Sequence, residues 1–223
     1  MKRRSFMTQG SVRAGLVWLA CAVAIASPLA HSQAVSTQAP PALPAWLVEA
    51  ASRLDQSEVV RGEFEQTKFI KGFKKPLVSR GEFVIARGRG IQWMTLRPFP
   101  STLVVTRDRL TTVTPGGTQQ IDVRREPGLR AVNDLLMAVL GGDMKTLNDR
   151  FQLDGGLQGA QGWRMTLVPR DTALSRFIAR IEMEGDRHVQ VVRMSEASGD
   201  ENRIRFTRHG HAGLSPLESE RLR

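Results

Sequence analysis

The residues with the clearest chemical potential are two carboxylates in one predicted strand. Glu182 and Glu184 lie two positions apart, so they share a strand face and could act as an acid and base in glycoside hydrolysis. Arg180 and Arg193 are their expected ionic neighbours. Since exposed ion pairs are an ordinary feature of protein surfaces, we interpret the two glutamates as salt-bridged surface residues.

Three histidines outside the N-terminal segment could bind a metal ion. His209 and His211 would share a strand face, but two histidines without a third ligand do not make a metal site. His188 follows Asp186 and Arg187 at a predicted turn, where a surface histidine is the ordinary expectation. We therefore predict no metal site.

Familiar catalytic motifs are absent from the sequence. No serine occurs in a Gly-x-Ser-x-Gly elbow, and there is no His-Glu-x-x-His motif. Gly88-Arg89-Gly90 lacks the rest of a dinucleotide fingerprint, so we interpret it as a turn. The sequence therefore predicts neither catalysis nor a cofactor.

Residues 1–34 have the features of a secretory signal peptide. Lys2-Arg3-Arg4 precedes an apolar run from Ala14 to Ala26, and Ser32-Gln33-Ala34 supplies small residues for cleavage. The apolar run is short for a membrane span. The paired arginines also resemble a twin-arginine signal, so the Sec and twin-arginine routes both stay open. Either route predicts an exported protein of the bacterial periplasm.

Charge and cysteine content narrow the partners further. The segment 1–34 holds four of the 32 basic residues and no acidic one, which leaves 28 basic against 22 acidic residues. The excess basic residues are scattered and are not interleaved with aromatic residues, so we expect no nucleic-acid partner. Such a basic surface is suited to contact with an acidic membrane surface. Cys21 is the single cysteine, and its removal with the signal excludes disulfides.

Hydrophobic periodicity predicts three helices, over residues 45–57, 128–140 and 143–149. Apolar residues recur at helical spacing in the first two, and Asp143 is a suitable N-cap for the third. Residues 35–44 are proline-rich and are expected to form a flexible linker. Residues 209–223 show no periodicity and are expected to fray.

Residues 81–98 carry the clearest strand pattern. Phe83 and Ile85 alternate before a turn at Gly88 and Gly90, and Ile91 and Trp93 repeat the alternation after it. Similar patterns predict about ten antiparallel strands, and so long a sheet must curl. The predicted fold is therefore mainly β with α: a curled antiparallel sheet that forms an open half-barrel under a helical lid, as one domain over residues 45–208.

The apolar face of this sheet is broad enough to hold a lipid chain. Methionines supply an adaptable apolar surface there. An ordinary core is the competing interpretation for each residue. The candidate lining residues are Phe83, Ile85, Ile91, Trp93, Leu103, Val105, Leu136, Met137, Leu140, Met165, Leu167 and Met183.

The order of several short motifs resembles the periplasmic outer-membrane lipoprotein carrier family, LolA, over nearly the whole mature chain. The motifs are Phe64-x-Gln66-x-Lys68, Ser79-x-Gly81-x-Phe83, Gln92-Trp93, Pro98, Leu135-Leu136, Asp143 to Phe151 and Leu167-x-Pro169. The resemblance implies an open β-barrel with an α-helical lid. It also implies an arginine that latches the lid shortly before the tryptophan. Arg87 is the match by spacing and Arg89 the alternative.

The same resemblance implies a carrier that takes lipoproteins from an inner-membrane releasing transporter to an outer-membrane receptor, with their acyl chains in its cavity. We predict such a carrier, monomeric and in transient contact with membrane surfaces. The main alternative is a LolA-like carrier or assembly factor for a non-lipoprotein acyl product. A scaffold without cargo and a periplasmic hydrolase are less favoured.

Overall fold

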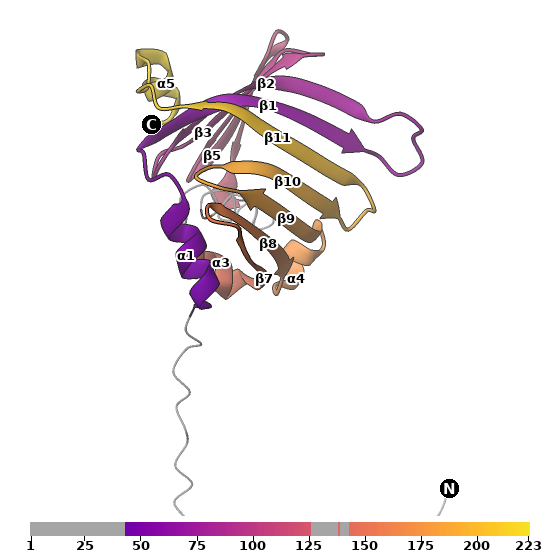
Figure 1. The fold of residues 1–223 in the computed structure, drawn as a ribbon. Coiled ribbons are helices and arrows are strands. Elements are labelled where there is room, and N and C mark those ends of the chain that lie inside the picture. Colours follow the sequence, from indigo (N-terminus) through magenta and orange to yellow (C-terminus); the bar gives the residue numbers. More distant parts are fainter. Residues whose placement is uncertain (1–42, 126–137, 139–142) are drawn as a thin grey trace, which may run out of the picture. The chain divides into compact units, whose positions relative to one another are not determined.

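The fold is built on one curled antiparallel sheet (Figure 1). The computed structural model describes residues 43–125, 138 and 143–223. Their eleven strands lie in the order β6-β5-β4-β3-β2-β1-β11-β10-β9-β8-β7. The sheet is not closed into a barrel, because β6 and β7 form its two edges. The predicted fold class, mainly β with a few helices, is confirmed.

The strands form two meanders that meet where β1 pairs with β11. The first meander comprises β1 (Val59–Phe69), β2 (Leu77–Ala86), β3 (Gly90–Arg97), β4 (Ser101–Thr106), β5 (Arg109–Thr114) and β6 (Gly117–Asp122). The second comprises β7 (Phe151–Gln158), β8 (Gly162–Pro169), β9 (Ile178–Gly185), β10 (Val189–Glu196) and β11 (Glu201–Gly210). A short 3-10 helix, η1 (Val123–Arg125), follows β6. The first and last strands are thus neighbours at the centre of the sheet.

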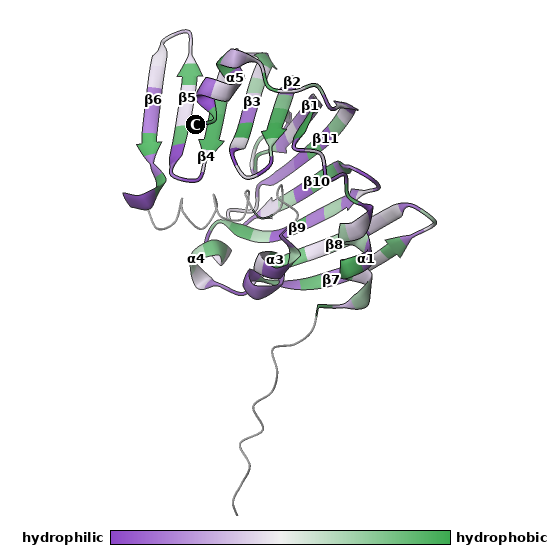
Figure 2. Ribbon diagram, turned by 90° about the vertical axis from the view of Figure 1, so that its left-hand side faces the viewer, coloured by the Kyte–Doolittle hydropathy of each residue, from purple (hydrophilic) through white to green (hydrophobic). Residues whose placement is uncertain are grey.

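Among the described residues, the helices that cover the second meander are α1 (Ala45–Arg53), α3 (Met144–Arg150) and α4 (Thr172–Ser175). Figure 2 shows them gathered near β7, β8 and β9. One buried cluster joins Leu47 of α1 and Leu147 of α3 to Met165 and Leu167 of β8. None of the helices in the described part of the chain has the length and hydrophobicity to cross a bilayer.

Two of the predicted helices can be compared with the structure. Helix α1 ends at Arg53, four residues earlier than predicted, because the backbone turns extended at Leu54 and Asp55 N donates to Arg187 O at 2.8 Å. Helix α3 begins after Asp143, whose carboxylate accepts a hydrogen bond from Thr146 N. The predicted helix 128–140 lies outside the described residues except for Ala138, which is helical and buried. The predicted signal peptide and most of the predicted linker also lie outside them.

The C-terminal segment is ordered, so the prediction that residues 209–223 fray is wrong. Strand β11 continues to Gly210, and helix α5 (Pro216–Arg221) follows with a capping box between Ser215 and Glu218. Leu222 is buried against Ala86 and Val104, on the sheet face opposite the other helices. Leu222 after the helix and half-buried Leu214 before it are the apolar contacts of this segment, and neither lies within the helix, so the sequence shows no helical period there.

Candidate functional site

An apolar cavity of about 110 Å³ lies on the helix-covered face of the sheet, where the two meanders meet. Its apolar lining comes from five strands and from the linker that follows α1: Leu54, Val60, Phe83, Ile85, Met183, Val189, Val192 and Phe206. Its polar end is formed by Asp55, Ser57, Arg87, Arg187, His188 and His209. The cavity is therefore apolar along its wall and charged or polar at one end, as small-molecule sites commonly are.

An aromatic cluster forms the floor beside this cavity. The rings of Phe83 and Phe206 meet edge to face with centroids 5.2 Å apart, and Phe64 stacks on Trp93 at 3.8 Å. Trp93 also contacts Phe206 at 5.9 Å. Such aromatic pairs hold one another in fixed orientations, so the floor is preorganised.

Two glycines make room for these rings. Gly62 lies directly opposite Phe83, and Gly81 lies directly opposite Phe64. A Cβ at Gly62 would come within 2.8 Å of the Phe83 ring, and a Cβ at Gly81 within 2.9 Å of the Phe64 ring. Each aromatic ring thus lies over the backbone of the neighbouring strand. This packing gives a physical reason for the glycine in the Ser79-x-Gly81-x-Phe83 motif.

The predicted lining residues fall into four groups. Phe83, Ile85 and Met183 line the cavity. Ile91, Trp93, Leu103 and Val105 share its sheet face by register but lie further along β3 and β4. Met165 and Leu167 belong to the filled core beneath α1 and α3. Leu136, Met137 and Leu140 lie outside the described residues.

The two candidate latch arginines point to different faces of the sheet. Arg87 lines the cavity, and its Nη2 donates to the carbonyl oxygen of Asp55 at 2.8 Å, just beyond the end of α1. Arg89 is exposed, and its Nη2 donates to the carbonyl and hydroxyl oxygens of Ser219 in α5. Of the two, Arg87 is placed to act on the cavity.

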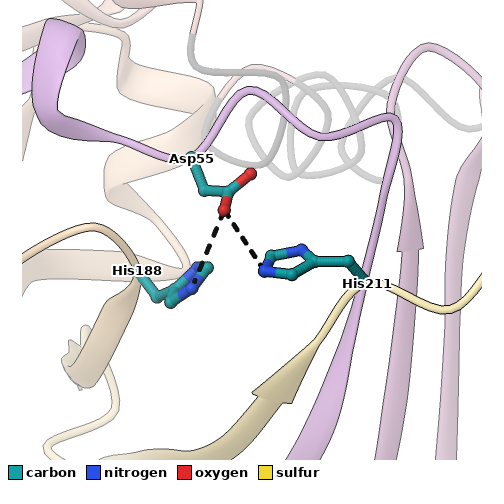
Figure 3. Close-up of side chains that lie close together, drawn as sticks. All are labelled: Asp55, His188 and His211. Carbon is teal, nitrogen blue, oxygen red and sulfur yellow. Dashed lines mark ion pairs between the residues drawn. The ribbon is translucent and has the colours of Figure 1, made fainter.

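A cluster of one carboxylate and three imidazoles lies at the polar end of the cavity. Asp55 Oδ2 lies 3.9 Å from His188 Nε2 and 3.5 Å from His211 Nε2, and Figure 3 shows the carboxylate directed at both rings. The ring of His209 stacks on that of His188 with centroids 4.4 Å apart. Sequence analysis missed this cluster because Asp55 is more than a hundred residues from each histidine, and the histidines meet one another only through the pairing of β10 with β11.

The surroundings set the charge state of this cluster. Hydrogen bonds from Ser57 lower the pKa of Asp55, and the nearby histidines lower it further, so the group is a carboxylate. Burial lowers the pKa of His188 and of His209 by disfavouring the imidazolium. His188 and His209 are therefore neutral near pH 7.

The paired glutamates are engaged in ion pairs, as predicted. Arg180 Nη1 lies 3.1 Å from Glu182 Oε1, and Arg193 Nη2 lies 3.2 Å from Glu184 Oε1. Both glutamates alternate with Met183, which faces the cavity, so they point to the opposite side of the sheet. The two carboxylates therefore do not contribute to the cavity.

A curled antiparallel sheet with an apolar cavity on its helix-covered face is typical of a protein that binds an apolar ligand. The family described as outer membrane lipoprotein carrier protein LolA matches residues 55–214, and the chain belongs to this family. The proteins of this family are carriers, and the cavity agrees with that class. No curated protein matches the chain.

Several solved structures are similar to the chain at low identity. A LolA superfamily protein from Nitrosomonas europaea is 10% identical with a TM-score of 0.44, over 77% of this chain and 94% of that chain. A DUF1329 family protein from Desulfovibrio piger is 11% identical with a TM-score of 0.47, over 79% and 96%. The MucA/MucB complex of Pseudomonas aeruginosa matches at 15% identity with a TM-score of 0.43, over 78% and 59%. Because these TM-scores are below 0.5, the family assignment rests on the match of the LolA family to residues 55–214.

Proposed function

We propose that this protein is a periplasmic carrier that shields the acyl chains of a lipoprotein, or of a related lipid, during transfer from the inner to the outer membrane. The apolar cavity bounded by Phe83, Ile85 and Met183 supports the proposal most directly. Each methylene removed from water contributes about 0.8 kcal/mol. The membership of the LolA family supports the same class of cargo.

The size of the cavity requires that cargo widen it. A volume of about 110 Å³ is smaller than the ~150 Å³ cavity that holds one benzene. A long acyl chain therefore needs more of the apolar sheet face than is open here. In this proposal the closed form releases cargo, and the acyl chain competes with the protein's own helices for the same face.

Arg87 is the proposed latch of the closed form. Its guanidinium binds the backbone carbonyl of Asp55, which lies in the segment that joins α1 to β1. Leu54, Asp55 and Ser57 of that segment form one wall of the cavity. The hydrogen bond therefore holds this wall against β2, and breaking it frees the wall to move outward.

Binding of a fluorescent acyl probe tests the proposal. Val192 lines the cavity, whereas Val113 is also half-buried but lies on β5 away from it. We expect Val192→Asp to weaken binding of dansyl-undecanoic acid more than about tenfold, because the carboxylate must be desolvated beside the ligand. Val113→Asp is the matched control and should bind the probe like the parent. Equal affinity in both variants, or no binding by the parent protein, would contradict the carrier proposal.

Native mass spectrometry of gently purified protein identifies the cargo. A diacylated or triacylated peptide would establish lipoprotein as the cargo. A small acylated compound would favour the alternative, a carrier or assembly factor for a non-lipoprotein acyl product. The small closed volume of the cavity is the observation that keeps this alternative open.

Transient membrane contact is the second part of the proposal, alongside an inner-membrane releasing transporter and an outer-membrane receptor. Phe73 is 72% exposed and Phe99 is 81% exposed, in the β1–β2 and β3–β4 loops, which antiparallel pairing brings to one end of the sheet. Three lysines, Lys71, Lys74 and Lys75, lie in the first loop. Exposed aromatic rings beside lysines are suited to an anionic bilayer surface.

Sedimentation with vesicles tests this contact. We expect the double variant Phe73→Ser with Phe99→Ser to lose most binding to phosphatidylglycerol vesicles, because both apolar anchors are removed. The control is Leu157→Ser, which removes an exposed apolar side chain beside the β7–β8 turn, at the opposite end of the sheet. Loss of binding in the control as well would show that the effect is not specific to this end of the sheet.

A further inference from the structure

We propose that Asp55, His188 and His211 form a binding site for a divalent transition-metal ion, with Zn²⁺ as the best fit. The three ligand atoms lie within 4.8 Å of one another. They come from three segments far apart in the sequence: the α1–β1 linker, the β9–β10 turn and the residues after β11. The proposal does not depend on the nature of any acyl cargo.

The distances between the ligand atoms are close to those of a tetrahedral zinc site. Zn–N and Zn–O bonds of about 2.0 Å place neighbouring ligand atoms roughly 3.3 Å apart. Asp55 Oδ2 already lies 3.5 Å from His211 Nε2 and 3.9 Å from His188 Nε2. Side-chain shifts of less than about 1 Å would bring the three protein ligands into place, and water would take the fourth position.

The backbone and neighbouring groups hold two of these ligands in place. Asp55 N donates to Arg187 O at 2.8 Å, and Asp55 Oδ1 accepts from Ser57 N at 2.7 Å, which leaves Oδ2 facing the imidazoles. The carboxylate side chain is only 6% exposed. His188 N donates to Asp186 Oδ1, and the stacked ring of His209 fixes the plane of the His188 imidazole. Such supporting contacts orient ligands before the metal arrives.

The separations within the cluster suit a bridging cation better than direct contact. Asp55 Oδ2 and His188 Nε2 are 3.9 Å apart, which is too long for a hydrogen bond. A metal ion between them would bind the carboxylate oxygen and the imidazole nitrogens together.

One charge opposes metal binding. Arg187 Nη2 lies 3.6 Å from Asp55 Oδ2. The arginine side chain is 70% exposed, so it can turn into solvent when the metal binds. Its ion pair with Asp55 is a weak competitor, because the atoms are 3.6 Å apart and an exposed arginine loses side-chain freedom when it is held in such a pair.

The ligand set points to zinc among the common divalent ions. Imidazole nitrogens suit Zn²⁺, Cu²⁺, Ni²⁺ and Fe²⁺, whereas Mg²⁺ and Ca²⁺ prefer oxygen ligands throughout. Two histidines and one carboxylate are the protein ligands found in several open zinc sites. We therefore use Zn²⁺ as the probe, with Mg²⁺ as the negative comparison.

The site would link metal binding to the cavity. Asp55 and His188 both line the polar end of the cavity, and Arg87 binds the carbonyl of the same Asp55. Ligation would cross-link the wall formed by the α1–β1 linker to the β9–β10 turn and to the end of β11. Zinc should thus stabilise the folded protein, since only the folded chain brings the ligands together.

Calorimetric titration of untagged, EDTA-treated protein with zinc chloride tests the site. We expect one Zn²⁺ per chain, no binding of Mg²⁺, and a rise in Tm of about 5–10 °C at zinc concentrations near 100 times Kd. His211→Ala and Asp55→Asn should each weaken zinc binding by more than about tenfold, because each removes a ligand. His211 is exposed, so its replacement should not impair folding.

His209→Asn is the matched control. His209 lies two residues from His211 in the same cluster but does not belong to the proposed ligand set. Its replacement should leave the stoichiometry unchanged and alter Kd by less than the loss of a ligand does. Two results would overturn the site: no zinc binding by the parent protein, or loss of binding in His209→Asn as large as in His211→Ala.

Discussion

Two regions of the sheet, the core beneath the helices and the junction of the two meanders, use the same kinds of apolar residue for different purposes. Under α1 and α3, the second meander buries Phe151, Trp163 and Leu167 almost completely. Where the meanders meet, Phe83, Ile85 and Val192 surround open volume instead. The first region is therefore a filled core that holds the fold, and the second is the small cavity that we propose widens to accept the acyl chain. Alternation alone does not distinguish them.

Truncation in the filled core should have the largest effect on stability. Leu167 is 0% exposed, so Leu167→Ala should lower the free energy of unfolding by about 2–5 kcal/mol through lost burial and a new cavity. Ile85→Ala should cost about 1 kcal/mol, because Ile85 is half-buried and already borders open space. Urea denaturation followed by fluorescence measures both.

Acyl-probe binding should rank the same two variants in the opposite order. Ile85→Ala should weaken binding of dansyl-undecanoic acid, whereas Leu167→Ala should leave the affinity of the folded protein unchanged. If Leu167→Ala weakened probe binding as much as Ile85→Ala does, the acyl chain would extend beneath α1 and the two regions would not be separate.

Loss of the proposed latch should change the free energy of probe binding by less than Leu167→Ala changes the free energy of unfolding. Arg87→Leu removes a charge-assisted hydrogen bond to Asp55 O, worth about 1.5 kcal/mol or more in the closed form. Probe affinity should rise about tenfold, because opening the cavity then costs less. Stopped-flow release of the probe should slow accordingly.

Arg89→Leu is the control for this experiment. It removes the hydrogen bonds to Ser219 of α5, on the opposite face of the sheet. Probe affinity should stay at the parent value. An increase in both variants would assign the effect to lost positive charge, and no change in either would reject Arg87 as the latch.

The dependence of stability on pH should be the smallest effect. Burial lowers the pKa of His188 and of His209, so between the folded and unfolded pKa values the unfolded chain binds more protons. Metal-free protein should therefore lose stability as pH falls below about 6.5, the ordinary histidine value. Urea midpoints at pH 7.5 and 5.5 measure the loss.

The double variant His188→Gln with His209→Gln should flatten this pH dependence. Asp55 contributes to stability in a separate pH range. Because its pKa is lowered in the folded protein, its carboxylate stabilises the fold above about pH 3.8, and this stabilisation is lost as pH falls further. An unchanged slope between pH 7.5 and 5.5 in the double variant would place the titrating groups elsewhere.

The sequence alone determined the secondary structure of the sheet and the kind of surface that it presents. Strict alternation at Phe83, Ile85, Ile91 and Trp93 specified a hairpin with one apolar face, because side chains of a strand point to opposite faces in turn. Asp143 marked the start of α3 through its side-chain oxygen. These features depend on residues close together in the chain, so local physics is sufficient.

Only the tertiary structure decided which apolar residues line a cavity, and where the polar groups meet. The antiparallel pairing of β1 with β11 closes a separation of about 140 residues, and no local pattern encodes that contact. It places Phe206 against Phe83 and brings His211 towards Asp55. Leu222 likewise orders the C-terminal helix by burial against Ala86 and Val104. Burial and long-range strand pairing are properties of the whole fold, and they separate core from site.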